Sequence, residues 1–173
     1  MMHARRLFTA FAFIALTAGV ARAQVRVLLP AWADPVLMDS MKVDHPLKAD
    51  PVAVYAAVQK AYADLGIPVG NTDNKKGIIG SDKFERLHTA AGTTLSRIFS
   101  CGESQTGPNA DSHRLSIAVA TWVAPGRDGG SVLSTATTAS AQDIAGAARA
   151  PRRCSSLGWL EAKVASTVEK YLR

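Results

Sequence analysis

The sequence predicts an α+β fold, a two-layer sandwich in which an antiparallel sheet of about four or five strands is covered on one face by two helices. Three observations predict it. Apolar residues recur at helical spacing in residues 51–65 and again near the C-terminus. Two pairs of extended runs lie between them, and a cluster of turn-forming residues joins each pair. Because hairpins build antiparallel sheets, and an amphipathic helix must bury one side, the helices are expected to cover one sheet face.

The first 23 residues have the pattern of a cleaved secretory signal. Arg5 and Arg6 precede the charge-free apolar run 7–20, and residues 21–23 (Ala-Arg-Ala) supply the small-x-small pattern of a cleavage site. The run is shorter than the roughly 20 residues that a membrane-spanning helix needs, which argues against the alternative of an uncleaved anchor. We expect a mature chain that begins at Gln24, does not span the membrane and lies in the periplasm or outside the cell.

Removal of this leader halves the net charge. The precursor carries +6 at pH 7, whereas the mature part, with 17 basic and 14 acidic residues, carries +3. A charge of this size does not indicate a nucleic-acid partner. The mature length suits one domain. We expect residues 24–49 to form an N-terminal extension or a first strand, with Val36–Val43 as the strand, and residues 50–173 to form a single α+β domain.

The first helix is expected over residues 51–65. Asp50 supplies an N-cap oxygen, Pro51 suits the first helical position, and Gly66 suits the residue just past the end. The apolar stripe of this helix is Val54, Val58, Ala61 and Leu65. A first hairpin follows, in which the turn formers of residues 71–77 separate two extended runs.

A short helix over residues 93–99 is expected to lead to Cys101, and residues 103–111 to form a polar loop. Residues 114–123 alternate apolar and polar side chains, and the glycine-rich turn 126–130 joins them to residues 131–141 in a second hairpin.

The last part of the chain is expected to end in a long helix. Residues 143–153 are alanine-rich and predict a loose loop or a frayed helical turn. Ser155 or Ser156 is the expected N-cap of the terminal helix. Its apolar stripe is Leu160, Val164, Val168 and Leu172.

The two cysteines of the mature part, Cys101 and Cys154, predict one disulfide. An even cysteine count in an exported chain favours a disulfide, because oxidising compartments form and keep such bonds. A pair of buried free thiols is the alternative. In the chain-entropy model, a disulfide that closes such a long loop stabilises the fold by at most about 4 kcal/mol.

Residues 50–80 resemble part of a known family. Residues 54–58, 64–69 and 77–80, with Asp73, resemble the helix–hairpin opening of the helix-grip domains of the outer-membrane assembly lipoprotein BamC. The sequence departs from that family because it lacks the lipid-bearing cysteine and a second domain. The resemblance implies a non-catalytic scaffold or accessory role at the cell envelope. The segments around Cys101 and Cys154 also resemble those of uncharacterised exported bacterial proteins.

Candidate catalytic and metal sites are few. No G-x-S-x-G motif occurs, and His88, His113 and Asp111 are the tempting triad partners, with the last two only two residues apart in a polar loop. His45 is expected at the surface. The residues at the calcium-loop offsets are Asn71, Asp73, Lys75 and Asp82, and a lysine cannot coordinate the ion. We therefore expect no enzymatic activity, no metal and no cofactor.

Two classes of function stay open. The first is a non-catalytic binding or scaffold module whose partner is a protein or another envelope component. The second is a carrier of a small apolar ligand in a cavity between helix and sheet. A closed core favours the first, and an apolar cavity of several hundred Å³ the second. A hydrolase is a distant third.

The predicted interaction surface is the outer face of the sheet. If Leu115, Ile117 and Val119 point inward, alternation places Arg114 and Trp122 outward, and both residue types are common in binding hot spots. The favoured alternative is that a terminal segment containing Trp32 folds over this face and buries Trp122.

Overall fold

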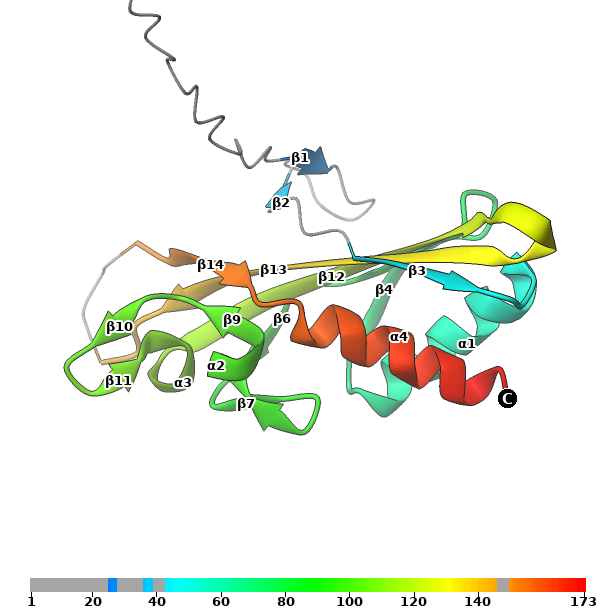
Figure 1. Ribbon diagram of the computed structural model, residues 1–173. Coiled ribbons are helices and arrows are strands. Elements are labelled where there is room, and N and C mark those ends of the chain that lie inside the picture. The colour runs from blue at the N-terminus through cyan, green and yellow to red at the C-terminus, as the bar shows by residue number, and fades with distance from the viewer. Residues whose placement is uncertain (1–24, 28–35, 39–42, 146–149) are drawn as a thin grey trace, which may run out of the picture.

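The computed structural model describes residues 25–27, 36–38, 43–145 and 150–173 (Figure 1). The predicted leader lies outside the described residues. One antiparallel sheet forms the centre, and two long helices cover one of its faces. The predicted α+β class is confirmed. The sheet strands are β3 (Val43–Leu47), β4 (Val69–Asp73), β5 (Ile78–Ser81), β6 (Phe84–Arg86), β9 (Phe99–Ser100), β12 (Arg114–Pro125), β13 (Ser131–Gln142) and β14 (Arg152–Ser156).

Two long strands, β12 and β13, form the spine of the sheet. They pair along their whole length, from Arg114 opposite Gln142 to Pro125 opposite Ser131. Each also pairs with two short strands placed end to end. Strands β5 and β6 pair with successive parts of β12, and β3 and β14 pair with successive parts of β13. Strand β4 pairs with the outer side of β5, and β9 pairs with the outer side of β14.

The sheet therefore contains eight strands, although each half is five strands wide. One half has the order β4-β5-β12-β13-β3 and the other β6-β12-β13-β14-β9. The predicted count of about four or five is too low as a number of strands. The reason is that strands of two to five residues are too short to show a period of two in the sequence.

The covering helices are α1 (Pro51–Asp64) and α4 (Trp159–Tyr171). They pack against each other, and from the same side α1 contacts β12 and β13 and α4 contacts β13 and β3 (Figure 1). The predicted N-cap of α1 is confirmed, because the Asp50 carboxylate accepts hydrogen bonds from the backbone N–H of Val52 and Ala53. Gly66 follows the helix with φ +64°, as its predicted place requires. The core contains the side chains of Val54, Val58, Tyr62, Ile79, Leu115, Ile117, Val119, Leu133, Leu160, Val164 and Val168.

Short elements fill the polar middle of the chain. They are β7 (Thr89–Ala90), β8 (Thr93–Thr94), α2 (Leu95–Ile98), β10 (Glu103–Ser104), β11 (Gly107–Pro108), α3 (Asn109–Ser112) and a 3₁₀ turn η1 (Arg127–Gly129). The predicted short helix is present as α2. The predicted polar loop 103–111 is in part a small hairpin followed by a helical turn.

Two predictions near the C-terminus are wrong. The predicted loose loop 143–153 extends too far, because Arg152 and Arg153 already belong to β14, whose backbone pairs with the preceding strand β13 and with β9, which is distant in sequence. The N-cap of α4 is Gly158, with φ +81°, rather than Ser155 or Ser156. The Ser156 hydroxyl still contributes there, since it accepts a hydrogen bond from the Gly158 N–H at 3.1 Å.

The N-terminal part of the described chain contains three strands. Strands β1 (Val25–Val27) and β2 (Val36–Met38) pair with each other on the side of the sheet away from the helices, where β2 contacts β13 (Figure 1). The predicted first strand, Val36–Val43, corresponds in part to β2. Strand β3, which belongs to the main sheet, begins only at Val43.

Candidate functional site

A groove opens at the end of the sandwich where β12 turns into β13. It has a volume of about 420 Å³ and lies between the first turn of α1, the β4–β5 turn and the end of β12. Ligand pockets commonly measure about 300–1,000 Å³, so the groove is large enough for a small molecule. The lining residues are Pro51, Val52, Tyr55, Asn74, Lys75, Lys76, Gly77, Val123, Ala124 and Pro125.

The start of α1 supplies one wall of the groove. Asp50 and Pro51 fix where the helix begins, and this places Val52 in its first turn. The Val52 side chain is 79 % exposed, although it is apolar. It does not lie on the stripe of α1 that packs against the sheet, so its apolar character contributes nothing to the core.

The β4–β5 turn supplies a second, polar wall. The Asp73 carboxylate accepts hydrogen bonds from the backbone N–H of Lys75 and Lys76, each at 3.1 Å, and so fixes the turn. The Gly77 carbonyl accepts a hydrogen bond from the Val123 N–H at 2.8 Å, which joins the turn to β12. Gly77 has φ +64°, and a Cβ there would collide with the Val123 carbonyl oxygen. The close approach therefore requires glycine.

Tyr55 holds the turn against α1. Its hydroxyl donates a hydrogen bond to Asn74 Oδ1 at 2.5 Å. Burial has the largest effect and raises the pKa of Tyr55, a hydrogen bond with Thr72 lowers it in part, and the negative charge of Asp73 adds a still smaller upward effect. The hydroxyl is therefore protonated at neutral pH and can act as the donor.

The rim of the groove is positively charged. Lys76 Nζ lies 3.5 Å from Asp73 Oδ2, so its charge is partly compensated. Lys75 is exposed, and no carboxylate of the described residues forms an ion pair with it. The site thus combines apolar walls with one uncompensated cation at the edge.

The space between the helices and the sheet is closed behind the groove. Tyr62 is fully buried there, and its hydroxyl lies 2.9 Å from Thr121 Oγ1, which in turn lies 3.2 Å from Thr135 Oγ1. Burial raises the pKa of Tyr62, so this side chain stays neutral. The groove is therefore an opening at the end of the sandwich and does not extend into its centre.

The structure separates the two predicted surface residues, Arg114 and Trp122. Both lie on β12 and share its outer face, but eight residues at about 3.3 Å each place them roughly 26 Å apart. Arg114 is exposed, and its Nε lies 3.8 Å from Glu85 Oε2. Trp122 is half-buried. They do not form one compact site.

The outer face between them is covered in part. Ala118 and Ala120 are buried there, and β1 and β2 lie on the same side (Figure 1). Trp32, predicted to cover Trp122, lies outside the described residues.

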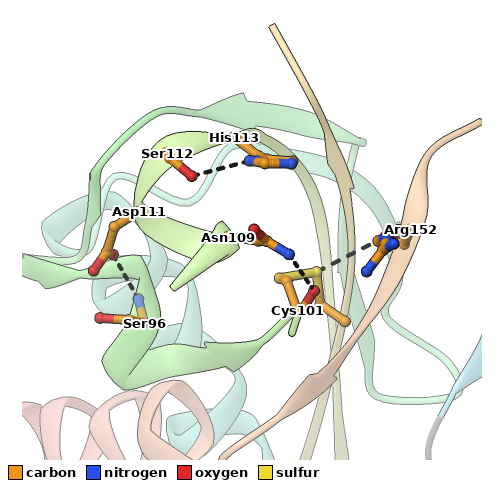
Figure 2. The surroundings of a disulfide bond; sticks show 8 residues. Ser96, Cys101, Asn109, Asp111, Ser112, His113 and Arg152 are labelled. Carbon is orange, nitrogen blue, oxygen red and sulfur yellow. Dashed lines mark hydrogen bonds between the residues drawn. A yellow bond between two sulfur atoms is a disulfide. The ribbon is translucent and has the colours of Figure 1, made fainter. Parts of the chain in front are cut away.

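The two cysteines are joined, as the sequence predicts (Figure 2). Their Cα atoms are 4.3 Å apart, and both side chains are buried. The alternative of free thiols is therefore wrong. The bond ties the segment after β9 to β14, and Asn109 Nδ2 donates a hydrogen bond to the Cys101 carbonyl beside it at 3.3 Å. Figure 2 shows Arg152 on the other side of the bond.

The candidate triad residues are not arranged as a triad. The Asp111 carboxylate accepts a hydrogen bond from the Ser96 N–H at 2.8 Å, and so caps the start of α2 (Figure 2). His88 Nδ1 lies 2.7 Å from the backbone carbonyl of Asp111, and His113 Nδ1 lies 3.0 Å from Ser112 Oγ. Neither imidazole bonds the carboxylate.

His45 is half-buried rather than at the surface. The reason is that β3 pairs with β13 and places His45 opposite the buried Leu133. In the described part of the chain, no group of three or more His, Cys, Asp or Glu residues lies close enough to hold a metal ion.

Sequence reasoning missed the groove because three distant segments build it. One signal was available in the sequence. Val52 is an apolar residue outside the core stripe of a well-predicted helix, and such a residue is a candidate for contact with something else.

No protein-family model matches this chain, and no curated protein matches it. No helix in the described ranges is both long enough and apolar enough to cross a membrane.

Proposed function

We propose that this chain is a non-catalytic, exported binding module of the bacterial envelope, and that the groove at the end of the sandwich holds its ligand. The observation that supports this most is the groove itself. It has the size of a ligand pocket, mostly apolar walls and a few polar groups at one edge, which is the usual composition of a binding site.

The disulfide supports the proposed location. Bonds of this kind form and persist in oxidising compartments, and Cys101 and Cys154 are placed to form one. Together with the predicted leader, this favours a mature chain that starts at Gln24 and works in the periplasm or outside the cell. The resemblance to BamC-like helix-grip domains stays a prediction, and an accessory role at the envelope would agree with it.

The groove also keeps the second function open, a carrier of a small apolar ligand. The position of the ligand differs from the cavity between helix and sheet that the sequence predicts. The centre of the sandwich is filled by side chains such as Tyr62, so a ligand would lie at the end of the helix–sheet layer and stay partly open to solvent.

Chemical-shift mapping tests the proposal. The probe is decanol, a neutral apolar chain, added to ¹⁵N-labelled mature protein that spans residues 24–173. We expect saturable shifts that cluster at Val52, Gly77 and Val123, because these residues line the groove. Shifts spread over the surface, or none at all, would reject the groove as a binding site.

A matched pair of variants checks the location. Val52→Asp places a charge in the apolar wall, and an acidic residue in the first turn of a helix does not harm the helix. Ala56→Asp makes a comparable change one turn later, at an exposed position outside the groove. Val52→Asp should abolish the clustered shifts, whereas Ala56→Asp should retain them.

A further inference from the structure

We propose that the ligand of the groove is an unbranched hydrocarbon chain that ends in a carboxylate, with the chain against the apolar walls and the carboxylate beside Lys75. This inference rests on the proposed function, because it names the ligand class of the same site.

The walls favour a hydrocarbon over a peptide, because they offer a peptide few backbone N–H groups as hydrogen-bond donors. Pro51 and Pro125 have no N–H. The Val52 N–H is donated to Asp50, and the Val123 N–H is donated to Gly77. The part of a peptide covered by these walls would have its N–H and C=O groups buried without backbone partners, which is unfavourable, whereas a hydrocarbon chain has no such groups.

The polar edge favours an anion. Tyr55 donates its hydrogen to Asn74 Oδ1, so the side-chain atom of Asn74 that remains is the amide nitrogen, a donor. Lys75 and Lys76 add two ammonium groups. A group that only accepts hydrogen bonds and carries a negative charge complements these donors, and a carboxylate is such a group.

The nearby carboxylates leave Lys75 without an ion-pair partner. Asp50 accepts two backbone N–H groups as the N-cap of α1. Asp73 accepts two backbone N–H groups of the turn and pairs with Lys76. Among the described residues, no carboxylate pairs with Lys75, so its ammonium group is available to bind the carboxylate of a ligand.

Calorimetric titration with two probes of equal chain length tests the inference. Decanoate and decanol are titrated, below the concentration at which they aggregate, into wild-type mature protein and into Lys75→Glu. The measured quantity is the ratio of the two affinities, decanoate over decanol. We expect this ratio to fall roughly fivefold or more in the variant, because an attraction becomes a repulsion. It should also fall in the wild type as salt is raised.

Lys163→Glu is the control. This variant has the same net charge as Lys75→Glu. Because Lys163 is exposed on α4 and does not line the groove, the variant should keep the wild-type affinity ratio. If both probes bind and Lys75→Glu leaves the ratio unchanged, the carboxylate assignment is wrong, while the groove still stands. If neither probe binds, the proposed function itself fails. Tighter binding of a short peptide with an apolar C-terminal residue than of decanoate would overturn the choice of occupant.

Discussion

Glu161 is the only fully buried carboxyl group among the described residues. Its Oε1 accepts hydrogen bonds from Thr137 Oγ1 at 2.5 Å and from Ser156 Oγ at 2.7 Å. Ser156 Oγ also accepts the Gly158 N–H at the start of α4. One side chain thus connects β13, β14 and α4. A buried polar group is stabilising only while its partners are present, so this connection is sensitive to small changes.

We predict that Glu161→Leu lowers the free energy of unfolding by about 1–3 kcal/mol, because the Thr137 and Ser156 hydroxyls lose their acceptor without a large change of volume. Glu161→Gln keeps an oxygen in the same place and should cost clearly less. Urea denaturation of both variants measures the difference. Equal losses in the two would show that the hydrogen bonds at Oε1 are unimportant.

At the scale of elements, the β4–β5 turn decides whether the groove exists. The turn approaches β12 closely through the Val123–Gly77 hydrogen bond, and it also carries both lysines of the rim. Its position depends on Gly77, which combines a left-handed backbone with contact against the β12 main chain.

Gly77→Ala should therefore lower stability by about 2 kcal/mol or more, since the substitution adds a collision to the usual cost of a left-handed alanine. Gly92→Ala is the matched control. Gly92 has φ +79°, but a Cβ added there would meet no atom within 4 Å, so only the backbone cost of about 1–2 kcal/mol applies. Thermal unfolding compares the two. A loss at Gly77 no larger than that at Gly92 would contradict the close approach.

The sequence predicts some secondary-structure elements much better than others. The β12–β13 hairpin was predicted almost to the residue, because residues 114–123 alternate apolar and polar side chains, residues 131–141 are rich in Val and Thr, and the turn between them is rich in glycine. Strand β14 was not predicted. It has five residues, begins with two arginines and lies between the preceding strand β13 and the sequence-distant strand β9. Short strands of this kind depend on tertiary pairing rather than on their own composition.

At the scale of the whole molecule, the sandwich has a closed centre and an open end. The helices α1 and α4 and the sheet bury a continuous core, and the disulfide fixes the opposite half, at β9 and β14. The groove lies at the end where β12 and β13 turn, and its walls come from residues 51–55, 74–77 and 123–125. No window of the sequence contains these three segments together, so sequence reasoning found the helix and the turns but not the site that they form.

A crystal structure of the mature protein with decanoate is the most direct test of the proposed site. We predict that the chain lies between Val52 and Val123 and that its carboxylate lies within hydrogen-bonding distance of Lys75 or Asn74. Decanoate bound on the outer face of the sheet near Trp122, with the groove empty, would contradict the assignment of the groove as the binding site.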